Sequence, residues 1–394
     1  MKLQIERAHG TIIAPPSKSA LHRRLILNAI EGSFDAPRDP CTDVGVICEG
    51  LRAIRAGDPV SLRDCGAAMR FLIPVSLLFG GASFTGSERL SERPLLPLLN
   101  ALRAHGADIS SDALPLTVSG SLRPGHYIMD GGISSQFFSG LMMTLPFLSG
   151  DSFLGWTDRL ASDGYVTLTE RILNEHGVVV RREGNGYSIP GNQTPVALPL
   201  AVEGDWSCAA PMLILGAIAG SVTVTGLDMH SVQPDRAILD ALSQCGAHVS
   251  IDGDAVTVSK GTLSGCKFNG DRAPDLVPAL AALGCASEGD TVLYRLGRLR
   301  LKESDRFEAI LRLLASLGAD FETENGDTVA IHGHGAIKGG FAEVPLDHRM
   351  VMAAAVMSAA SAMPVTLSET DSLNKSYPTF LRDFERIGGR IDAI

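Results

Sequence analysis

The stretch Leu311-Arg-Leu-Leu-Ala-Ser-Leu-Gly318-Ala-Asp-Phe321 holds the local pattern that is repeated along the whole chain. Leucines three and four positions apart predict an amphipathic helix. A glycine directly after such a helix suits the left-handed backbone that ends it, and the Ala-Asp-Phe run that follows has the character of a short strand. This segment therefore predicts a helix that stops at Gly318 and leads into a β-strand.

The same pattern of helix, glycine and short β-like run occurs six times. The glycines are Gly57, Gly106, Gly177, Gly246, Gly318 and Gly388. The first interval between them is 49 residues, whereas the next four are 71, 69, 72 and 70 residues. A period near 70 is too long for the repeat of a solenoid and suits a βαβ-type module. The sequence thus predicts an α/β protein of six repeats.

Most repeats also carry a second helix, which is apolar on nearly all sides and is therefore expected to be buried. These helices are expected over residues 69–78, 137–148, 207–219, 276–283 and 350–360. Six repeats divide into two domains of three. Interruptions near residues 15 and 204 indicate one continuous domain, 15–204, and one discontinuous domain, 1–14 with 205–394.

Composition limits the class of protein. A chain of 394 residues is long enough for two domains with full cores. Its 45% hydrophobic residues, 42 glycines and 21 prolines are typical of α/β proteins with many tight turns. The net charge of −10, with no basic tail or stripe, argues against nucleic-acid and membrane partners.

The cysteines and the N-terminus indicate the compartment. Seven cysteines are scattered without a C-x-x-C pair, which indicates reduced thiols instead of a disulfide framework or a zinc site. The first residues, Met-Lys-Leu-Gln-Ile-Glu-Arg, lack the apolar region of a signal peptide, and no uninterrupted apolar run of about 18 residues occurs. We therefore expect a cytoplasmic protein.

Residues 299–306, Leu-Arg-Leu-Lys-Glu-Ser-Asp-Arg, are unusually rich in charge. Asp305 followed by Glu308 fits a capping box, so the next helix is expected to begin at Arg306. Lys302 and Glu303 then lie in the turn before a helix N-terminus, where backbone N–H groups favour anions. Taken alone, the segment is well explained as a solvated helix start with a cap.

Similar groups of cations, hydroxyls and glycines occur where other helices are expected to begin. Residues 15–23, Pro-Pro-Ser-Lys-Ser-Ala-Leu-His-Arg, run from a strand into a helix. The chain contains neither a G-x-x-x-x-G-K-[ST] phosphate loop nor a G-x-G-x-x-G after a strand, so a nucleotide cofactor is not expected. Each segment alone has an ordinary explanation as a cap or a surface ion pair. Further candidates are Gly66, Arg89, Arg93, Ser134, Ser135, Gln136, Ser162, Tyr165, Asp275, His348 and Lys375.

Taken together, eight segments resemble the 5-enolpyruvylshikimate-3-phosphate synthase family (3-phosphoshikimate 1-carboxyvinyltransferases). The match runs in order over nearly the full length, and eight motifs in register are specific although each is weak alone. The resemblance implies the two-domain enolpyruvyl-transferase fold, an inside-out α/β barrel with three βαβαββ-like repeats in each domain. The segments are Pro-Ser-Lys-Ser with Arg23, Cys-Gly-Ala-Ala-Met-Arg70, Glu-Arg-Leu-Ser-Glu-Arg-Pro94, Ser-Ser-Gln136, Pro-Asp275, Lys-Glu-Ser-Asp-Arg306, Asp-His-Arg349 and Lys-Ser-Tyr-Pro378.

The resemblance also implies a reaction. Members transfer the enolpyruvyl group of phosphoenolpyruvate to the 5-hydroxyl of shikimate 3-phosphate, through a tetrahedral intermediate and with release of phosphate. This step belongs to the shikimate pathway of chorismate and aromatic amino acid biosynthesis. The resemblance implies no metal and no cofactor. We expect a monomer whose active site lies in the interdomain cleft and is assembled by closure over the substrates.

Position by position, the resemblance assigns the site residues. Asp275 is expected to accept the hydroxyl proton and Glu303 to deliver the main proton to carbon, and Lys18 and Lys302 complete the catalytic set. The phosphoenolpyruvate set is Lys18, Gly66, Arg89, Gln136, Arg306, Arg349 and Lys375. The shikimate 3-phosphate set is Lys18, Ser19, Arg23, Ser134, Ser135, Gln136, Ser162, Tyr165, Asp275 and Lys302. The continuous domain would therefore bind shikimate 3-phosphate, and the discontinuous domain would supply the acid–base residues.

Three features depart from the family pattern. The short first glycine interval implies that the second repeat has lost material. Ala67 stands where many members carry threonine, which removes a hydroxyl beside Gly66. Arg298 replaces what is commonly a small polar or acidic residue, four positions before Lys302.

Three alternative functions are weaker. UDP-N-acetylglucosamine enolpyruvyl transferases have asparagine where Ser19 follows Lys18 here, and residues 64–94 lack their cysteine loop. RNA 3′-phosphate cyclases need a nucleotide and a nucleic acid, which the acidic charge disfavours. A binding module without activity would be expected to have lost Asp275, Lys302 or Glu303, and all three are present.

Overall fold

The computed structural model describes residues 1–393. They form two compact units: unit 1 combines residues 1–17 with the chain from residue 203 onward, and unit 2 comprises residues 18–202. Unit 2 thus begins three residues after, and ends two residues before, the expected limits 15 and 204. Helices and four-stranded sheets alternate in both units, which confirms the α/β fold class. No helix within residues 1–393 is long and apolar enough to cross a membrane.

One repeat of unit 1 illustrates the βαβαββ order. Its elements are β14 (Lys267–Asn269), α10 (Val277–Ala286), β15 (Glu288–Tyr294), α11 (Arg306–Ser316), β16 (Asp320–Glu324) and β17 (Thr328–His334). The crossover through α10 makes β14 and β15 parallel, and the β16–β17 hairpin completes the sheet in the order β14-β15-β17-β16. The stretch from Leu311 to Phe321 spans the end of α11, the glycine and the start of β16, as predicted.

Two more repeats in unit 1 follow this order and use the N-terminal strands. Their elements are β1 (Lys2–Gln4), β2 (Ala8–Ile13), α8 (Trp206–Ala219), β11 (Gly220–Thr225), α9 (Ile238–Gln244), β12 (His248–Asp252), β13 (Ala255–Ser259), β18 (Gly340–Ala342), α12 (His348–Met357), β19 (Val365–Leu367), α13 (Phe380–Arg386) and β20 (Arg390–Asp392). β2 pairs in parallel with β11, and β1 lies between β19 and β20. The sheet orders are β12-β13-β11-β2 and β18-β19-β1-β20.

Unit 2 contains two sheets, in the orders β3-β4-β6-β5 and β7-β8-β10-β9. Its strands are β3 (Val60–Ser61), β4 (Ala82–Thr85), β5 (Ala107–Ile109), β6 (Leu116–Gly120), β7 (His126–Asp130), β8 (Ser152–Thr157), β9 (Arg181–Glu183) and β10 (Gly186–Ile189). Its helices are α1 (Lys18–Glu31), α2 (Thr42–Ala56), α3 (Gly66–Ser76), α4 (Glu88–Ser91), α5 (Leu96–Ala104), α6 (Ser135–Met142) and α7 (Gly164–Glu175).

All six repeat glycines have a positive φ, between 74° and 107°, as expected for residues that end helices in the left-handed region. A hairpin follows Gly106, Gly177, Gly246 and Gly318, but β3 begins only three residues after Gly57. The missing hairpin explains the short first interval. Residues 32–41, between α1 and α2, contain no strand either, so this repeat of unit 2 consists of helices alone.

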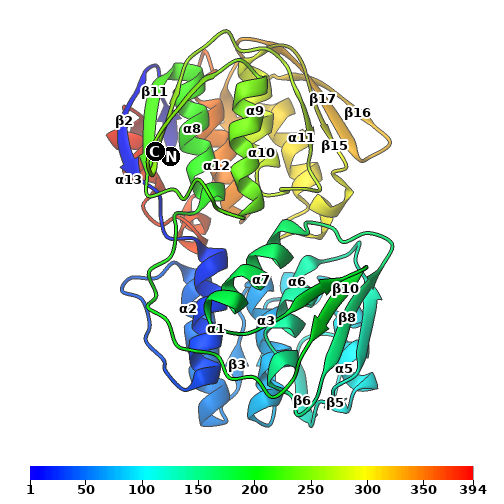
Figure 1. Cartoon of the computed structure of the whole chain (residues 1–394). Helices are drawn as coiled ribbons and strands as arrows, with labels where there is room; N and C mark the ends of the chain where they lie inside the picture. Colours follow the sequence, from blue (N-terminus) through cyan, green and yellow to red (C-terminus); the bar gives the residue numbers. More distant parts are fainter. Residues whose placement is uncertain (394) are drawn as a thin grey trace. The chain divides into compact units, whose positions relative to one another are not determined.

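The apolar helices α3, α6, α8, α10 and α12 begin within three residues of their predicted starts. The largest difference is at the end of α6, which stops at Met142 instead of continuing to 148. Pro146 lacks the N–H that would bond to the carbonyl of Met142, and the chain continues as the short 3-10 helix η2 (Leu145–Phe147). In unit 1, α10 packs against both α8 and α12. These three helices form the centre of the unit, and the sheets lie around them (Figure 1).

Candidate active site

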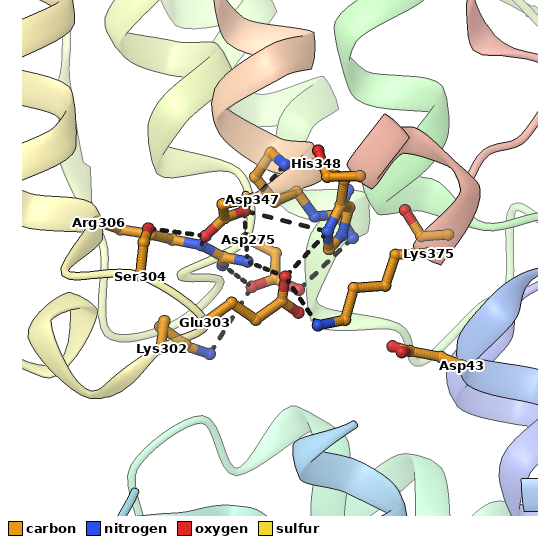
Figure 2. Close-up of polar contacts among 12 residues, drawn as sticks. Asp43, Asp275, Lys302, Glu303, Ser304, Arg306, Asp347, His348 and Lys375 are labelled. Carbon is orange, nitrogen blue, oxygen red and sulfur yellow. Dashed lines mark hydrogen bonds and ion pairs between the residues drawn. The ribbon is translucent and has the colours of Figure 1, made fainter. Parts of the chain in front are cut away.

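Charged side chains from four segments of unit 1 converge in one cluster (Figure 2). Asp275 lies in the loop before α10, and Lys375 ends the 3-10 helix η5 (Asp371–Lys375). The other members come from residues 302–306, which follow the 3-10 helix η4 (Gly297–Leu301), and from residues 347–349 at the start of α12. The structure therefore brings together residues up to a hundred positions apart in the sequence.

Two aspartate caps fix the helix starts that present these side chains. The Asp305 carboxylate accepts a hydrogen bond from the Glu308 backbone N–H at 3.1 Å, and α11 begins at Arg306 as predicted. Asp347 caps α12 in the same way, accepting from the Arg349 N–H at 3.0 Å. Each cap satisfies a backbone donor that the helix itself cannot, so the register of the charged residues is set locally.

Asp275 is the carboxylate on which three cations converge. Arg306 Nη1 lies 2.7 Å from Oδ1, Lys302 Nζ lies 3.7 Å from the same oxygen, and Arg349 Nη2 lies 3.5 Å from Oδ2. The Asp275 side chain remains 24% exposed, whereas those of Arg306 and Arg349 are 2–3% exposed. A carboxylate that is held by buried cations and is still open to solvent is well suited to exchange protons with a ligand.

Arg306 is anchored from the other side by Asp347, which the sequence analysis did not assign. Its Nε donates to Asp347 Oδ2 at 2.7 Å and its Nη2 donates to Oδ1 at 3.2 Å, a two-point pairing within the core. The Ser304 hydroxyl donates to the same carboxylate at 3.0 Å. Burial raises the pKa of Asp347, but the Arg306 charge outweighs this effect and holds the pKa below its ordinary value.

Glu303 faces a second group of nitrogen-bearing side chains. Its Oε2 lies 3.1 Å from His348 Nδ1, 3.4 Å from Lys375 Nζ and 3.9 Å from Arg306 Nη2. Burial raises the pKa of Glu303, but these three neighbours outweigh it and hold the pKa well below its ordinary value of 4.5. Glu303 is therefore a carboxylate at neutral pH in the substrate-free protein.

The depressed pKa values of Glu303 and Asp347 predict the pH dependence of stability. A carboxyl whose pKa is lower in the folded protein contributes stability above its unfolded pKa, and this contribution is lost as the pH falls through the folded value. The free energy of unfolding should therefore drop from about pH 5 to about pH 3, more steeply in the unaltered protein than in Glu303→Gln. Urea unfolding at several pH values measures the slopes.

The matched control is Glu308→Gln, because Glu308 also pairs with an arginine, Arg300 at 2.7 Å, but its side chain is 46% exposed. This variant should keep the slope of the unaltered protein, since exposed pairs contribute little. Parallel curves for the unaltered protein and Glu303→Gln would contradict the assignment.

Glu303, Asp347 and His348 also offer three possible metal-ligand atoms within 4.8 Å of one another. Their surroundings do not suit a divalent cation, because Arg306 and Lys375 already place positive charge against both carboxylates. The electrostatics of the cluster instead favour an anion that replaces these carboxylates as the partner of the cations.

In unit 2, the structure places the assigned residues in well-defined contacts. Lys18, the first residue of α1, pairs with Asp43 at 2.8 Å. Gln136 Oε1, at the start of α6, accepts from Arg70 Nη1 at 2.9 Å. Arg89 pairs with Glu92 at 3.0 Å on the surface.

Arg23 is almost fully buried. Its guanidinium donates to the Thr169 and Ser139 hydroxyls and to the Ser19 and Tyr165 carbonyls, at 2.7–3.1 Å. Burial lowers the pKa of Arg23 to about 10. This side chain thus ties α1 to α6 and α7, and it holds the backbone of two residues of the predicted shikimate 3-phosphate set.

The remaining assigned residues lie at two helix starts. Ser134 caps α6 and accepts from the Gln136 N–H at 3.3 Å, and the adjacent Ser135 is buried. Ser162 is buried just before α7, with a φ of 51°, and Tyr165 is half-buried in the first turn of α7.

Gly66 opens α3 beneath the guanidinium of Arg93. A Cβ at this position would lie 2.6 Å from Arg93 Cζ, so the glycine is required for the close approach of that side chain. The neighbour of Gly66 in unit 2 is Arg93, a cation that could bind an anion.

Three partners in these contacts escaped assignment from the sequence. Asp347 and Arg70 lie inside motifs that carried the resemblance, but no local feature marks which residue they contact. Asp43 lies outside those motifs and had no signal. Arg298, which departs from the family pattern, pairs with Asp271 at 2.9 Å.

Two units of three repeats, five of which follow the βαβαββ order, and a cluster of cations around three carboxylates are characteristic of a two-domain α/β enolpyruvyl transferase. The family model for EPSP synthase (3-phosphoshikimate 1-carboxyvinyltransferase) matches residues 38–384. The chain belongs to this family, and it is accordingly an enzyme, a transferase of the shikimate pathway.

Curated relatives and solved structures agree with this membership. A 3-phosphoshikimate 1-carboxyvinyltransferase of Clostridium novyi is 39% identical and covers 100% of this chain and 98% of its own length. The enzyme of the same name from Clostridium kluyveri is 34% identical, with 98% and 96% covered. The structure of EPSP synthase from Acinetobacter baumannii has a TM-score of 0.79 at 24% identity over 100% of both chains, which shows the shared fold.

Proposed function

We propose that this chain transfers the enolpyruvyl group of phosphoenolpyruvate to the 5-hydroxyl of shikimate 3-phosphate and releases phosphate. The observation that carries the proposal is the convergence of Lys302, Arg306 and Arg349 on Asp275. Both substrates are polyanions, and buried cations that already hold a reactive carboxylate are the groups that such anions require. In addition, the Nε of Arg349 is buried without a hydrogen-bond partner among the described residues, which leaves a donor for a bound anion.

In this mechanism Asp275 removes the proton of the 5-hydroxyl while the oxygen attacks the central carbon of phosphoenolpyruvate. Glu303 supplies a proton to the methylene carbon, which gives the tetrahedral intermediate. Glu303 then takes a proton back from the new methyl group as the bond to phosphate breaks. The proton held by Asp275 leaves with the phosphate, so that both carboxyl groups return to their starting states.

The low pKa of Glu303 places a condition on this mechanism, because a proton donor must first be protonated. Lys375 and Arg306 are two of the groups that depress the pKa. An anionic substrate that pairs with these cations weakens their effect on Glu303 and raises its pKa. We infer that Glu303 takes up its proton when phosphoenolpyruvate binds.

The assigned residues of unit 2 complete the proposal. Lys18, Gly66, Arg89 and Gln136 would bind phosphoenolpyruvate together with Arg306, Arg349 and Lys375. Shikimate 3-phosphate would be held by Ser19, Arg23, Ser134, Ser135, Ser162 and Tyr165, with Lys18 and Gln136 serving both substrates. The guanidinium of Arg23 donates its hydrogen bonds to protein acceptors. Its role in substrate binding would therefore be to position Ser19 and Tyr165.

The test is phosphate release from phosphoenolpyruvate with two acceptors offered separately. Release is expected with shikimate 3-phosphate and not with UDP-N-acetylglucosamine, and omission of the acceptor gives the background. Release with UDP-N-acetylglucosamine alone would overturn the proposal and favour the related enolpyruvyl transferase.

Gly66→Ala is expected to raise KM for phosphoenolpyruvate about tenfold, since an added Cβ displaces the Arg93 guanidinium and one charged hydrogen bond is worth about this factor. The melting temperature should change little, because the displaced group is the end of a flexible side chain. Gly45→Ala, in α2 where an added Cβ meets nothing within 4 Å, is the matched control and should leave KM unchanged. An unaltered KM in Gly66→Ala would remove Arg93 and Gly66 from the site.

A further inference from the structure

Two cysteines of unit 1 lie together outside the charged cluster. Cys245 follows α9 and is fully buried, whereas Cys266 directly precedes β14 and is half-buried. The Cys245 thiol donates to the Cys266 sulfur, and the two Sγ atoms are 2.7 Å apart. A disulfide requires about 2.05 Å between the sulfur atoms, so a shift of less than an ångström would join them.

Backbone hydrogen bonds hold the two cysteines in place. The Ser264 N–H donates to the Cys245 carbonyl at 2.9 Å, which ties the end of α9 to the segment leading to Cys266. On its other side, the Cys266 carbonyl accepts from the Val292 N–H of β15 at 2.8 Å. These backbone hydrogen bonds therefore fix the positions of both cysteines, and the short distance between the sulfur atoms follows from them.

We propose that Cys245 and Cys266 form a reversible dithiol–disulfide site that is oxidised by small-molecule disulfides. The step begins with the half-buried Cys266, whose thiolate attacks one sulfur of the small disulfide. That S–S bond breaks, and one small thiol leaves with a proton. Cys245 then loses its proton and attacks the Cys266 sulfur, and the second small thiol leaves. Two protein thiols are oxidised by two electrons, and one small disulfide is reduced to two thiols.

The surroundings of the thiols support this order of events. The hydrogen bond from Cys245 lowers the pKa of Cys266 and raises the pKa of Cys245, so Cys266 is the better nucleophile as well as the more accessible sulfur. Once Cys266 carries a mixed disulfide, the Cys245 sulfur is already adjacent. The intramolecular step should therefore outrun attack by a second small thiol.

The disulfide would close a loop from residue 245 to residue 266 that contains the β12–β13 hairpin. Cross-linking a loop of this length restricts the unfolded chain, and we expect a rise in melting temperature of roughly 5–10 °C. Asp275 should stay in place, because β14 remains paired with β15 and the Asp271–Arg298 ion pair holds the loop between them. The oxidised protein is thus expected to be more stable and still active.

The experiment uses the full chain in mixtures of oxidised and reduced glutathione. Remaining thiols are alkylated, and the digested protein is examined by mass spectrometry. We expect a linked peptide joining Cys245 and Cys266, about 2 Da lighter than the two reduced peptides combined. Reduction should reverse the link, and the melting temperature should follow it. Alkylation of both thiols at every ratio, or a lasting glutathione adduct on Cys266 with Cys245 still reduced, would overturn the proposal.

Two variants separate this site from general thiol effects. Cys266→Ser should abolish both the linked peptide and the rise in melting temperature. Cys41→Ser removes the other half-buried cysteine and should leave both unchanged. Because the peptide map of the unaltered protein decides the question alone, a loss of folding in Cys266→Ser would not obscure the result.

Discussion

Turnover by Asp275→Asn is expected to fall by about two to four orders of magnitude, the usual contribution of a positioned general base. Asparagine keeps the size of the side chain and can still accept a hydrogen bond from Arg306 through its one carbonyl oxygen, but it cannot take the hydroxyl proton. The measurement is kcat with both substrates saturating, together with the melting temperature to confirm that the variant is folded.

Asp271→Asn is the matched control, since Asp271 lies in the same loop and also pairs with an arginine, Arg298 at 2.9 Å. Its turnover should stay within a few-fold of the unaltered protein. Near-normal turnover by Asp275→Asn would show that another group accepts the proton and would shift the base assignment away from Asp275.

Asp347→Asn is expected to lower the free energy of unfolding by about 3–5 kcal/mol, because it leaves the buried Arg306 charge without its principal partner. The side chains of Asp347 and Arg306 are 0% and 2% exposed, so water cannot replace the lost carboxylate. Denaturant unfolding, followed by a probe in unit 1, measures the loss. Turnover should fall as well, since Arg306 would be drawn further toward Asp275.

Asp305→Asn is the matched control, because it also replaces a charged N-cap residue by a neutral one. Asparagine caps helices as well as aspartate does, so both variants keep their N-caps. Asp305 forms an ion pair with Arg300, at 3.2 Å with both side chains 36% exposed, and the loss of its charge should cost less than about 1 kcal/mol. Equal losses in the two variants would mean that the buried pair contributes no more than a surface contact.

The sequence was sufficient for features that depend on neighbouring residues. The cap at Asp305, the start of α11 at Arg306 and the positive φ of Gly318 all follow from contacts within a few positions. The same holds for the buried helices, whose apolar character is continuous along the chain. Motifs in register were also sufficient to predict the family.

The sequence could not supply the partners of the charged groups. Asp347 pairs with Arg306 across 41 residues, and Asp43 pairs with Lys18 across 25 residues, so no periodicity links them. Likewise, Glu303 was predicted as a proton donor from its position in a motif. Its low pKa depends on His348 and Lys375, which only the fold brings within reach.

The pairing of β1 and β2 has a consequence for how the protein is made. β2 needs β11, more than two hundred residues later, and β1 needs β19 and β20 near the end of the chain. During synthesis, unit 2 can reach its final structure while the ribosome is still translating unit 1. β1 and β2 must therefore wait, unpaired, until their partner strands have been synthesised. A chain that is broken off within unit 1 would consist of a folded unit 2 and an N-terminal segment of unpaired strands, which is the kind of product that chaperones and proteases must clear.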